Sequence, residues 1–239
     1  MKIVSWNCRG AFRDKYPKVA KYDADIYVIS EAENPEKYVA DSEYEEYLNY
    51  ISDYKWLGDG EDKGILIFSK NKIIVENNFW NSKHKFFLSV KINNSLDLVG
   101  VWTQDNKALK SKYVEEVIPY LRIYEDKIRA SKNLIFCGDF NSNKIWDNEH
   151  KGRCHTDMVK IFNSMNLVSV YHRLNNEKQG EESVPTFFEY LHEDKPYHID
   201  YVFSKPGLVK NLEIGTYEEY VGGEDNNSDH VPLIFEVDL

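Results

Sequence analysis

The sequence predicts an α/β fold of the α+β kind, in which two packed sheets carry helices on their outer faces. About eleven short segments are rich in Val, Ile, Phe and Tyr, which favour strands. Gly and Asn interrupt these segments, as they do in tight turns between antiparallel strands. Two further segments show the apolar spacing that is typical of an amphipathic helix. Helices are therefore expected to cover sheets of mostly antiparallel strands.

The predicted strands follow one another along the whole chain. They cover residues 2–7, 26–30, 55–57, 64–69, 86–92, 96–102, 133–139, 186–190, 198–203, 208–216 and 231–237. Asn93 and Asn94 stand between two apolar segments and predict a hairpin turn, and Gly58-Asp59-Gly60 predicts another tight connection. Apolar residues at helical spacing occupy 113–121 and 158–165. Pro119 lies inside the first pattern, so that helix is expected to kink or to begin later.

The bulk properties of the chain indicate one globular domain. Its 239 residues can bury a sizeable core, and no change in composition marks a linker, so residues 1–239 are expected to form a single domain. No window approaches the ~18 apolar residues of a membrane span. The first strand lacks the apolar region of a secretory signal, and three cysteines do not suit a disulfide framework. We expect a cytoplasmic protein with reduced thiols, and the sequence indicates no protein partner.

The charge of the chain bears on its substrate. A net charge of −10 repels a polyanion at long range, whereas proteins that bind nucleic acid tightly usually carry a basic surface. This weakens a nucleic-acid substrate without excluding it. Carboxylates gathered to hold a cation would also make the total acidic.

Polar side chains stand where several predicted strands end. The apolar segment from Leu134 ends in Gly138-Asp139-Phe140-Asn141, and the segment from Ile26 ends in Ser30-Glu31. Asn7 closes the first strand, and Ser228-Asp229-His230 precedes the last. An Asx turn that stabilises a loop is the alternative explanation for any one of these residues. Taken together, they predict a cleft that is lined with carboxylates and amides.

Two of these groups predict a paired acid and base. Asp200 lies within the strand 198–203, and a buried carboxylate is costly without a partner. His230 is the candidate partner. Oxygen ligands suit Mg²⁺, which keeps several of its waters and needs only one or two protein carboxylates. The pattern therefore predicts a hard divalent cation, Mg²⁺ or Mn²⁺, beside an Asp and His pair.

Six motifs in order resemble those of the endonuclease/exonuclease/phosphatase superfamily, which includes deoxyribonuclease I. They are Ser5-Trp6-Asn7, Ser30-Glu31, Gly138-Asp139-Phe140-Asn141, Pro185-Thr186-Phe187, His198-Ile199-Asp200-Tyr201 and Ser228-Asp229-His230. The resemblance spans nearly the whole chain. It implies a four-layered α/β/β/α sandwich and a metal-dependent phosphoric ester hydrolase.

The resemblance also implies roles for individual residues. Glu31 matches the principal metal-binding glutamate, with Asn7 beside it and Asp229 as a second carboxylate near the cation. Asp139 matches the aspartate that orients or deprotonates the attacking water, and Asn141 matches an amide that contacts the phosphate. The remaining match is a catalytic Asp and His pair, formed by Asp200 and His230.

Three positions depart from the pattern of the best-known nucleases. Arg9 stands where many members have Asp or Asn, and Trp102 lies in a strand where many have a phosphate-contacting His or Tyr. The indole N–H of Trp102 can still donate a hydrogen bond to substrate. His198 stands where DNA-repair members more often have Arg. Asn7, Asn141, Trp102 and His198 are the expected substrate-binding residues.

Three functions remain open from the sequence. The first is a Mg²⁺-dependent phosphodiesterase or nuclease that cleaves DNA or RNA by in-line attack of an activated water. The second is a phosphatase or phosphodiesterase of a small-molecule or lipid phosphate, of the inositol phosphate or sphingomyelin type, which the acidic charge favours. The third is a binding module without activity, against which the complete set of polar residues argues. The choice of substrate is expected to lie in the loops 141–155 and 179–184.

Overall fold

Two six-stranded sheets pack face to face in the computed structural model, which describes residues 1–69, 75–77, 84–106, 111–149, 153–223 and 228–239. The first sheet has the order β15 (Val209–Ile214), β16 (Leu233–Val237), β1 (Lys2–Asn7), β2 (Ile26–Ala32), β4 (Gly64–Ser69) and β3 (Asp53–Gly58). The second has the order β11 (Val168–Ser169), β14 (Asp200–Ser204), β10 (Leu134–Asp139), β7 (Leu96–Trp102), β6 (Phe87–Ile92) and β5 (Val75–Asn77). Each sheet has one parallel pair, β1 with β2 and β10 with β7, and is otherwise antiparallel.

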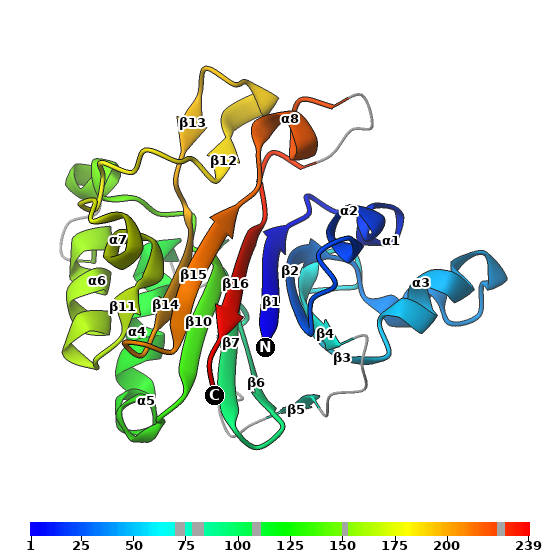
Figure 1. The fold of residues 1–239 in the computed structure, drawn as a ribbon, viewed down its shortest axis with the longest axis horizontal. Helices are drawn as coiled ribbons and strands as arrows, with labels where there is room; N and C mark the ends of the chain where they lie inside the picture. The colour runs from blue at the N-terminus through cyan, green and yellow to red at the C-terminus, as the bar shows by residue number, and fades with distance from the viewer. Residues whose placement is uncertain (70–74, 78–83, 107–110, 150–152, 224–227) are drawn as a thin grey trace.

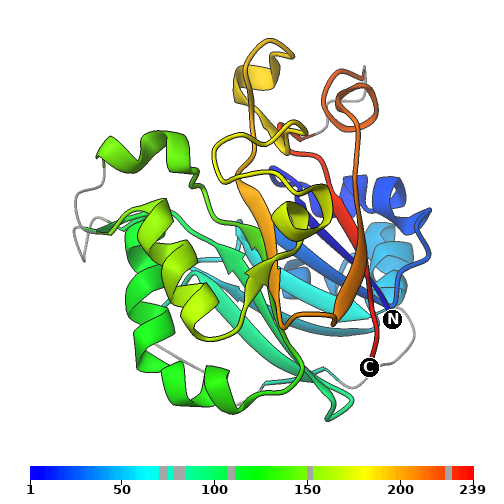
Figure 2. The same cartoon turned by 60° about the vertical axis from the view of Figure 1, so that its left-hand side comes forward.

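Helices cover the outer face of each sheet (Figures 1 and 2). The first sheet carries α1 (Phe12–Lys15), α2 (Pro17–Ala20) and α3 (Glu45–Tyr50), and the second carries α4 (Val114–Ile123), α5 (Glu125–Ala130) and α6 (His155–Ser164). Helix α7 (Val170–Asn175) packs against β14 and β15, one strand from each sheet, and its Val170 belongs to the core between the sheets. The order of layers is therefore helix, sheet, sheet, helix, as the resemblance implied. None of the helices in the described ranges has the length and apolarity needed to cross a membrane.

The central strands are buried on both faces, which explains their continuous apolar sequences. Along β10, Ile135 and Cys137 point into the core between the sheets, while Leu134 and Phe136 pack under the helices. Trp102 belongs to the same core between the sheets. Because side chains alternate between the faces of a strand, only residues at strand ends can leave these apolar layers.

Most of the predicted elements are confirmed. The strands 2–7, 64–69 and 96–102 have the predicted bounds, and Asn93 and Asn94 form the β6–β7 hairpin with φ of 47° and 54°. The strand predicted over 186–190 is shorter, because β12 (Phe187–Phe188) gives way to the 3₁₀ turn η4 (Glu189–Leu191). Helix α4 begins at Val114 and continues through Pro119, so it does not begin later.

Small elements surround the edge of the sheets at which β1 and β10 end. They are the hairpin of β12 with β13 (Pro196–Tyr197), the 3₁₀ helix η3 (Lys144–Glu149), helix α8 (Tyr217–Tyr220) and the pair β8 (Asp105–Asn106) with β9 (Ser111–Lys112). The 3₁₀ turns η1 (Pro35–Tyr38) and η2 (Ser42–Tyr44) precede α3. In Figure 1 the β12–β13 hairpin stands above the sheets.

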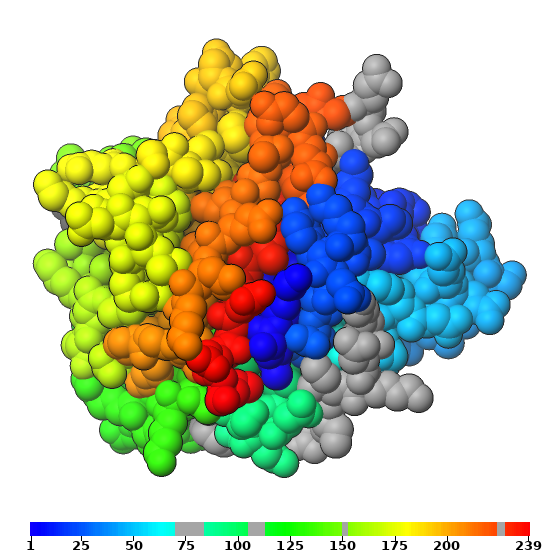
Figure 3. All heavy atoms as spheres, in the orientation of Figure 1, coloured from blue at the N-terminus to red at the C-terminus, as the bar shows by residue number. Residues whose placement is uncertain are grey.

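The two ends of the chain lie side by side. The amino group of Met1 donates a hydrogen bond to the Val237 carbonyl at 2.9 Å, because β1 pairs antiparallel with β16. Figure 3 shows these first and last segments adjoining on one face. This pairing brings residues 228–230, which precede β16, to the end of β1 where Asn7 lies.

Candidate active site

The site begins with a hydrogen bond between the two sheets. Asn7 at the end of β1 donates from Nδ2 to Asp139 Oδ2 at 2.9 Å and to Glu31 Oε1 at 3.1 Å. One amide therefore joins two carboxylates that lie 108 positions apart in the sequence. The parallel pairing of Asn7 with Ser30 places Glu31 directly beyond the end of β1.

Local backbone conformation directs these side chains. Glu31 has φ of 61° and Asn141 has φ of 45°, both in the left-handed region. Asparagine tolerates that region, whereas for Glu31 it is rare and costs on the order of 1–3 kcal/mol, so Glu31 retains it because the surroundings enforce it. Gly138 has φ of 136°, and a Cβ there would lie 2.1 Å from the Val101 carbonyl oxygen. Only glycine fits immediately before Asp139.

Asp139 is buried, and three N–H donors approach its carboxylate. Besides Asn7, its carboxylate accepts the Asn141 backbone N–H at 2.8 Å and the Asn141 side-chain amide at 2.9 Å. The same amide donates to the Thr103 carbonyl at 2.9 Å. Both N–H groups of the Asn141 side chain are thus engaged within the protein.

Asp200 and His230 form the pair that the sequence predicts. His230 Nδ1 lies 2.8 Å from Asp200 Oδ2, so Nδ1 carries a proton and donates it to the carboxylate. The other ring nitrogen, Nε2, lies 3.9 Å from Asp139 Oδ2. Asp200 itself is the antiparallel register partner of Asp139. The imidazole therefore stands between two carboxylates.

Two hydroxyl groups fix this pair from behind. Thr186 Oγ1 accepts the backbone N–H groups of Ile199 and Asp200, each at 3.0 Å. Ser228 Oγ accepts the His230 N–H at 3.0 Å and donates to the Asn7 carbonyl at 2.5 Å. These contacts explain why the Pro-Thr-Phe and Ser-Asp-His motifs accompany the carboxylates.

The electrostatics of the cluster follow from its burial. Burial and the charge of Asp200 raise the pKa of Asp139 to about 7, against the lowering effect of the His230 imidazolium. Burial disfavours charge on His230 as well, but Asp200 and Asp139 outweigh it and raise the His230 pKa to about 10. The imidazolium form of His230 is therefore present at neutral pH.

Cationic side chains face the two carboxylates that the resemblance assigns to the metal. Lys63 Nζ forms an ion pair with Glu31 Oε2. Arg9 Nε lies 3.7 Å from Asp229 Oδ2. Glu31 and Asp229 are both partly exposed, at 18% and 23% of their side-chain surface. Lys63 and Arg9 therefore already balance the charge of Glu31 and Asp229 at the mouth of the site.

The residues present fit a divalent cation. Ligand atoms of Asp139, Asp200 and His230 lie within 4.8 Å of one another. Because His230 is an imidazolium, the carboxylates of this group supply the oxygen ligands for a cation. The oxygens of Glu31 are linked to this group through Asn7. The geometry therefore brings together Asn7, Glu31 and Asp139, whereas Asp229 is directed to Arg9.

Trp102 and His198 are more buried than their predicted role in substrate binding suggests. Trp102 exposes 9% of its surface and packs in the core between the sheets. His198 exposes 4%, donates from Nδ1 to the Val184 carbonyl at 2.7 Å and packs on the Tyr171 ring. Burial lowers the pKa of His198, so its ring is neutral. Their contact with substrate stays a prediction.

A cavity of about 310 Å³ adjoins Asn141. Trp146, Phe187 and Tyr197 line it, and the Trp146 and Tyr197 rings lie 5.2 Å apart. Aromatic walls of this kind can hold a base or sugar ring beside the phosphate. Sequence analysis did not assign Phe187, Tyr197 or Lys63 to the site, although Phe187 lies in one of the six motifs.

Solved structures share this fold along the whole chain. A 3′-5′ exonuclease (NExo) from Neisseria meningitidis matches with a TM-score of 0.72 and 18% identity over 100% of both chains. A second NExo structure from Neisseria, a 3′ phosphatase bound to a product DNA hairpin, gives a TM-score of 0.68 at 18% identity, also over 100% of both chains. An AP endonuclease from Archaeoglobus fulgidus matches with a TM-score of 0.69 and 17% identity over 100% of both chains.

These likenesses show that the chain has the fold of the endonuclease/exonuclease/phosphatase superfamily that its six motifs resemble. At this level of identity they establish the fold alone. No protein-family model matches the chain, and no curated protein sequence does so either.

Proposed function

We propose that the protein is a metal-dependent phosphoester hydrolase, and more narrowly a phosphodiesterase or nuclease that acts on DNA or RNA. The observation that carries this proposal is the bond from Asn7 to Asp139 across the two sheets. The Asn7 amide joins Glu31 to Asp139. Asp139 Oδ2 lies 3.9 Å from Nε2 of His230, and Asp200 holds the His230 ring through Nδ1. A carboxylate, an imidazolium and a cation-binding glutamate are the groups that in-line attack at phosphorus requires.

Each residue has a separate task in this proposal. Asp139 holds the attacking water and accepts its proton. His230 offers an N–H from Nε2 to a phosphoryl oxygen, and Asp200 fixes the ring and stabilises its positive charge. Asn141 orients Asp139, because both of its amide N–H groups are engaged with Asp139 and Thr103. The phosphate contact that the resemblance implies for Asn141 requires one of these bonds to open.

The proposed cation is Mg²⁺ or Mn²⁺, held by Glu31 with Asn7 and Asp139 nearby and Asp229 at the rim. Oxygen donors suit Mg²⁺ and Mn²⁺ better than they suit Zn²⁺. When bound, such an ion neutralises charge that develops on the phosphoryl oxygens. Lys63 neutralises Glu31 in this structure, so a cation bound at Glu31 would displace the Lys63 ammonium.

The nucleic-acid substrate is supported by the named neighbours, among them an exonuclease, an AP endonuclease and a phosphatase bound to DNA. A small-molecule or lipid phosphate is the second candidate, which the net charge of −10 favours. We further propose that residues 1–239 act as one domain in the cytoplasm, which the free thiols of Cys8, Cys137 and Cys154 support.

A substrate panel tests the proposal. We expect phosphodiesters to be cleaved faster than phosphomonoesters, with nucleic acids among the better substrates. The panel compares single-stranded DNA, duplex DNA, abasic duplex, RNA, an aryl phosphodiester, sphingomyelin and inositol phosphates at one Mg²⁺ concentration. Turnover of a lipid or inositol phosphate orders of magnitude faster than every nucleic acid would replace the nuclease assignment with the second candidate.

A further inference from the structure

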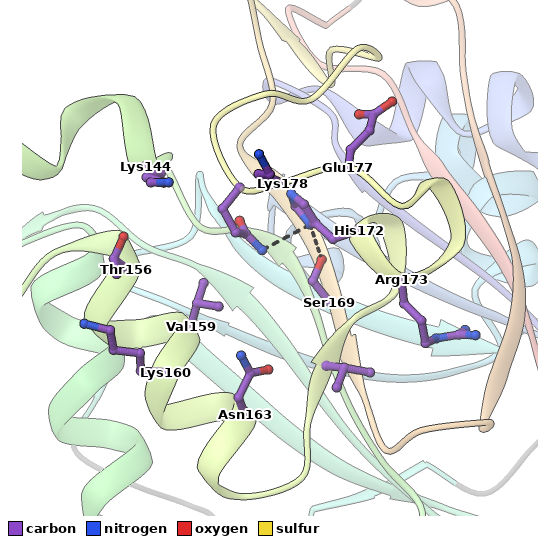
Figure 4. A pocket seen from close by; sticks show the side chains of 12 residues that line it. Lys144, Thr156, Val159, Lys160, Asn163, Ser169, His172, Arg173, Glu177 and Lys178 are labelled. Atoms are coloured by element: carbon purple, nitrogen blue, oxygen red, sulfur yellow. Dashed lines mark hydrogen bonds between the residues drawn. The ribbon is translucent and has the colours of Figure 1, made fainter.

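A second cavity, of about 570 Å³, lies between α6, α7 and η3, outside the candidate active site (Figure 4). Four cationic side chains line it: Lys144 from η3, Lys160 from α6, Arg173 from α7 and Lys178 from the loop that follows. We call this cavity the basic pocket. Its charge is opposite to the net charge of −10 that the chain carries as a whole.

The positive charge of the basic pocket is only partly balanced. Within the part of the chain that the structure describes, Lys144 and Lys178 form no ion pair, and Lys160 lies 3.8 Å from Asp157. The lining also includes Glu177, but its carboxylate accepts the Ser183 N–H at 2.8 Å and the Tyr171 hydroxyl at 2.7 Å. These hydrogen bonds stabilise the Glu177 carboxylate, whose single negative charge balances one of the four cations.

A chain of side-chain hydrogen bonds runs along the inner wall of the pocket. His172 Nδ1 accepts from Gln179 Nε2 at 3.1 Å and lies 2.7 Å from Ser169 Oγ. A dashed line in Figure 4 marks the contact between His172 and Ser169. His172 Nε2 then donates to Glu182 Oε1 at 3.0 Å. The other oxygen of Glu182 accepts from Asn143 at 3.1 Å. Hydrogen bonds therefore connect the wall to a residue two positions beyond Asn141.

The basic pocket lies within reach of a strand bound at the site. Lys144 follows Asn141 by three residues, so their Cα atoms are at most about 11 Å apart. Each strand of a B-form helix has one phosphate for every ~3.4 Å of the helix axis. The 3₁₀ helix η3 also connects the two regions, because Lys144 lines the basic pocket and Trp146 lines the aromatic cavity beside Asn141.

We propose that the basic pocket binds phosphate groups of the same nucleic-acid strand that the candidate site cleaves, a few nucleotides from the scissile phosphate. This inference rests on the proposed function, whose substrate class it narrows to a polymer that spans both regions. The pocket supplies local positive charge that an acidic protein otherwise lacks for holding a polyanion. A substrate with a single phosphate cannot reach both regions.

Equilibrium binding tests this inference without any turnover. The probe is a fluorescein-labelled single-stranded DNA of about ten nucleotides, and fluorescence anisotropy is measured in excess chelator at several salt concentrations. We expect the double variant Lys144→Glu with Lys160→Glu to weaken binding roughly tenfold or more. The slope of log affinity against log salt should fall by about 1.4, since each phosphate contact on a single strand contributes about 0.7.

Three controls make the result specific. Lys132→Glu reverses one lysine charge, half of the change in the double variant, at an exposed position that precedes β10, at the end opposite to Asn141, and should bind as the unmodified protein does. Lys144→Arg with Lys160→Arg should keep the affinity, because the charge remains. Thermal unfolding of each variant checks that the fold is retained.

Several outcomes would overturn the inference. They are equal affinity of the double variant and the unmodified protein, an equal loss in Lys132→Glu, and no measurable binding of the oligonucleotide. Displacement of the probe by adenosine monophosphate at an equal concentration would assign the pocket to a free nucleotide instead. Failure of the proposed function can be told apart from failure of this inference, because binding in excess chelator does not depend on hydrolysis. A protein that binds the strand through Lys144 and Lys160 but hydrolyses no phosphoester would refute the function and keep the pocket.

Discussion

The candidate active site and the basic pocket treat charge in opposite ways. In the site, Asp139 and Asp200 are buried, and each is hydrogen-bonded to a residue distant in sequence. In the basic pocket, lysines stand open to solvent, and Lys144 and Lys178 form no ion pair within the described ranges. Buried, hydrogen-bonded charges hold the reacting groups in a fixed geometry, as catalysis requires. Exposed lysines without an ion pair can bind phosphate groups, and such contacts supply affinity for a polyanion.

The largest effect is expected from Asp139→Asn. The substitution preserves volume and the hydrogen bonds at one of the two carboxylate oxygens, places an NH₂ where the other oxygen accepts, and removes the group that takes a proton from water. We expect turnover of an aryl phosphodiester to fall by about 10³-fold or more, while the fold is retained. Initial rates and circular dichroism on the same preparation test both expectations. A rate close to that of the unmodified protein would remove Asp139 from the mechanism.

The next effect concerns Asp200 and His230 as one unit. Because His230 Nδ1 donates to Asp200 at 2.8 Å, loss of either residue disables the pair. We expect Asp200→Asn, His230→Ala and the double variant to lose similar factors in kcat, so that the losses are far from additive. Steady-state rates of all four proteins test this. Losses that multiply would show that the two residues act independently.

A smaller effect concerns the wall of the basic pocket. Glu182 is partly buried, which disfavours its charge, but hydrogen bonds from His172, Gly180 and Asn143 outweigh this and lower its pKa to about 2. A carboxylate with a depressed pKa in the folded state stabilises the protein above its unfolded pKa, and this contribution is lost as pH falls. The contribution should decline between pH 4.5, the ordinary value, and about 2.

Urea unfolding of the unmodified protein and Glu182→Gln measures this loss. The difference in unfolding free energy should be on the order of 1 kcal/mol at pH 7, after allowance for solvent screening. It should shrink steadily as the pH is lowered below 4.5. A difference that stays constant down to pH 3 would show that the charge of Glu182 does not support the wall.

The sequence predicts the strands and the carboxylates for the same reason. A strand that is buried on both faces is apolar throughout, so polar residues at its end, such as Asp139 and Glu31, stand out. The alternation of side chains also explains why Trp102 is buried. It lies on the same face of its strand as Leu96 and Leu98, which point into the core between the sheets. The expectation that Trp102 contacts substrate came from the resemblance and did not use that alternation.

Other features were not predictable because they depend on contacts distant in sequence. Lys63 reaches Glu31 from a loop after β3, and Glu182 reaches His172 and Asn143 from another loop. Neither loop has a periodic pattern. Helices α1 and α2 have four residues each, too few to show helical spacing in the sequence. Thr186 belongs to a quoted motif, but its role as an acceptor for two backbone N–H groups appears only in the structure.

The most direct test of the central claim is the hydrolysis rate of an aryl phosphodiester as a function of Mg²⁺ concentration, for the unmodified protein and for Glu31→Gln. If Glu31 holds the cation beside Asp139, the unmodified protein shows no turnover in excess chelator and a saturable rise with Mg²⁺. Glu31→Gln should then show a much weaker apparent affinity for Mg²⁺ and a large loss of rate. Full turnover in excess chelator, or identical Mg²⁺ curves for the two proteins, would contradict a metal-dependent site built on Glu31.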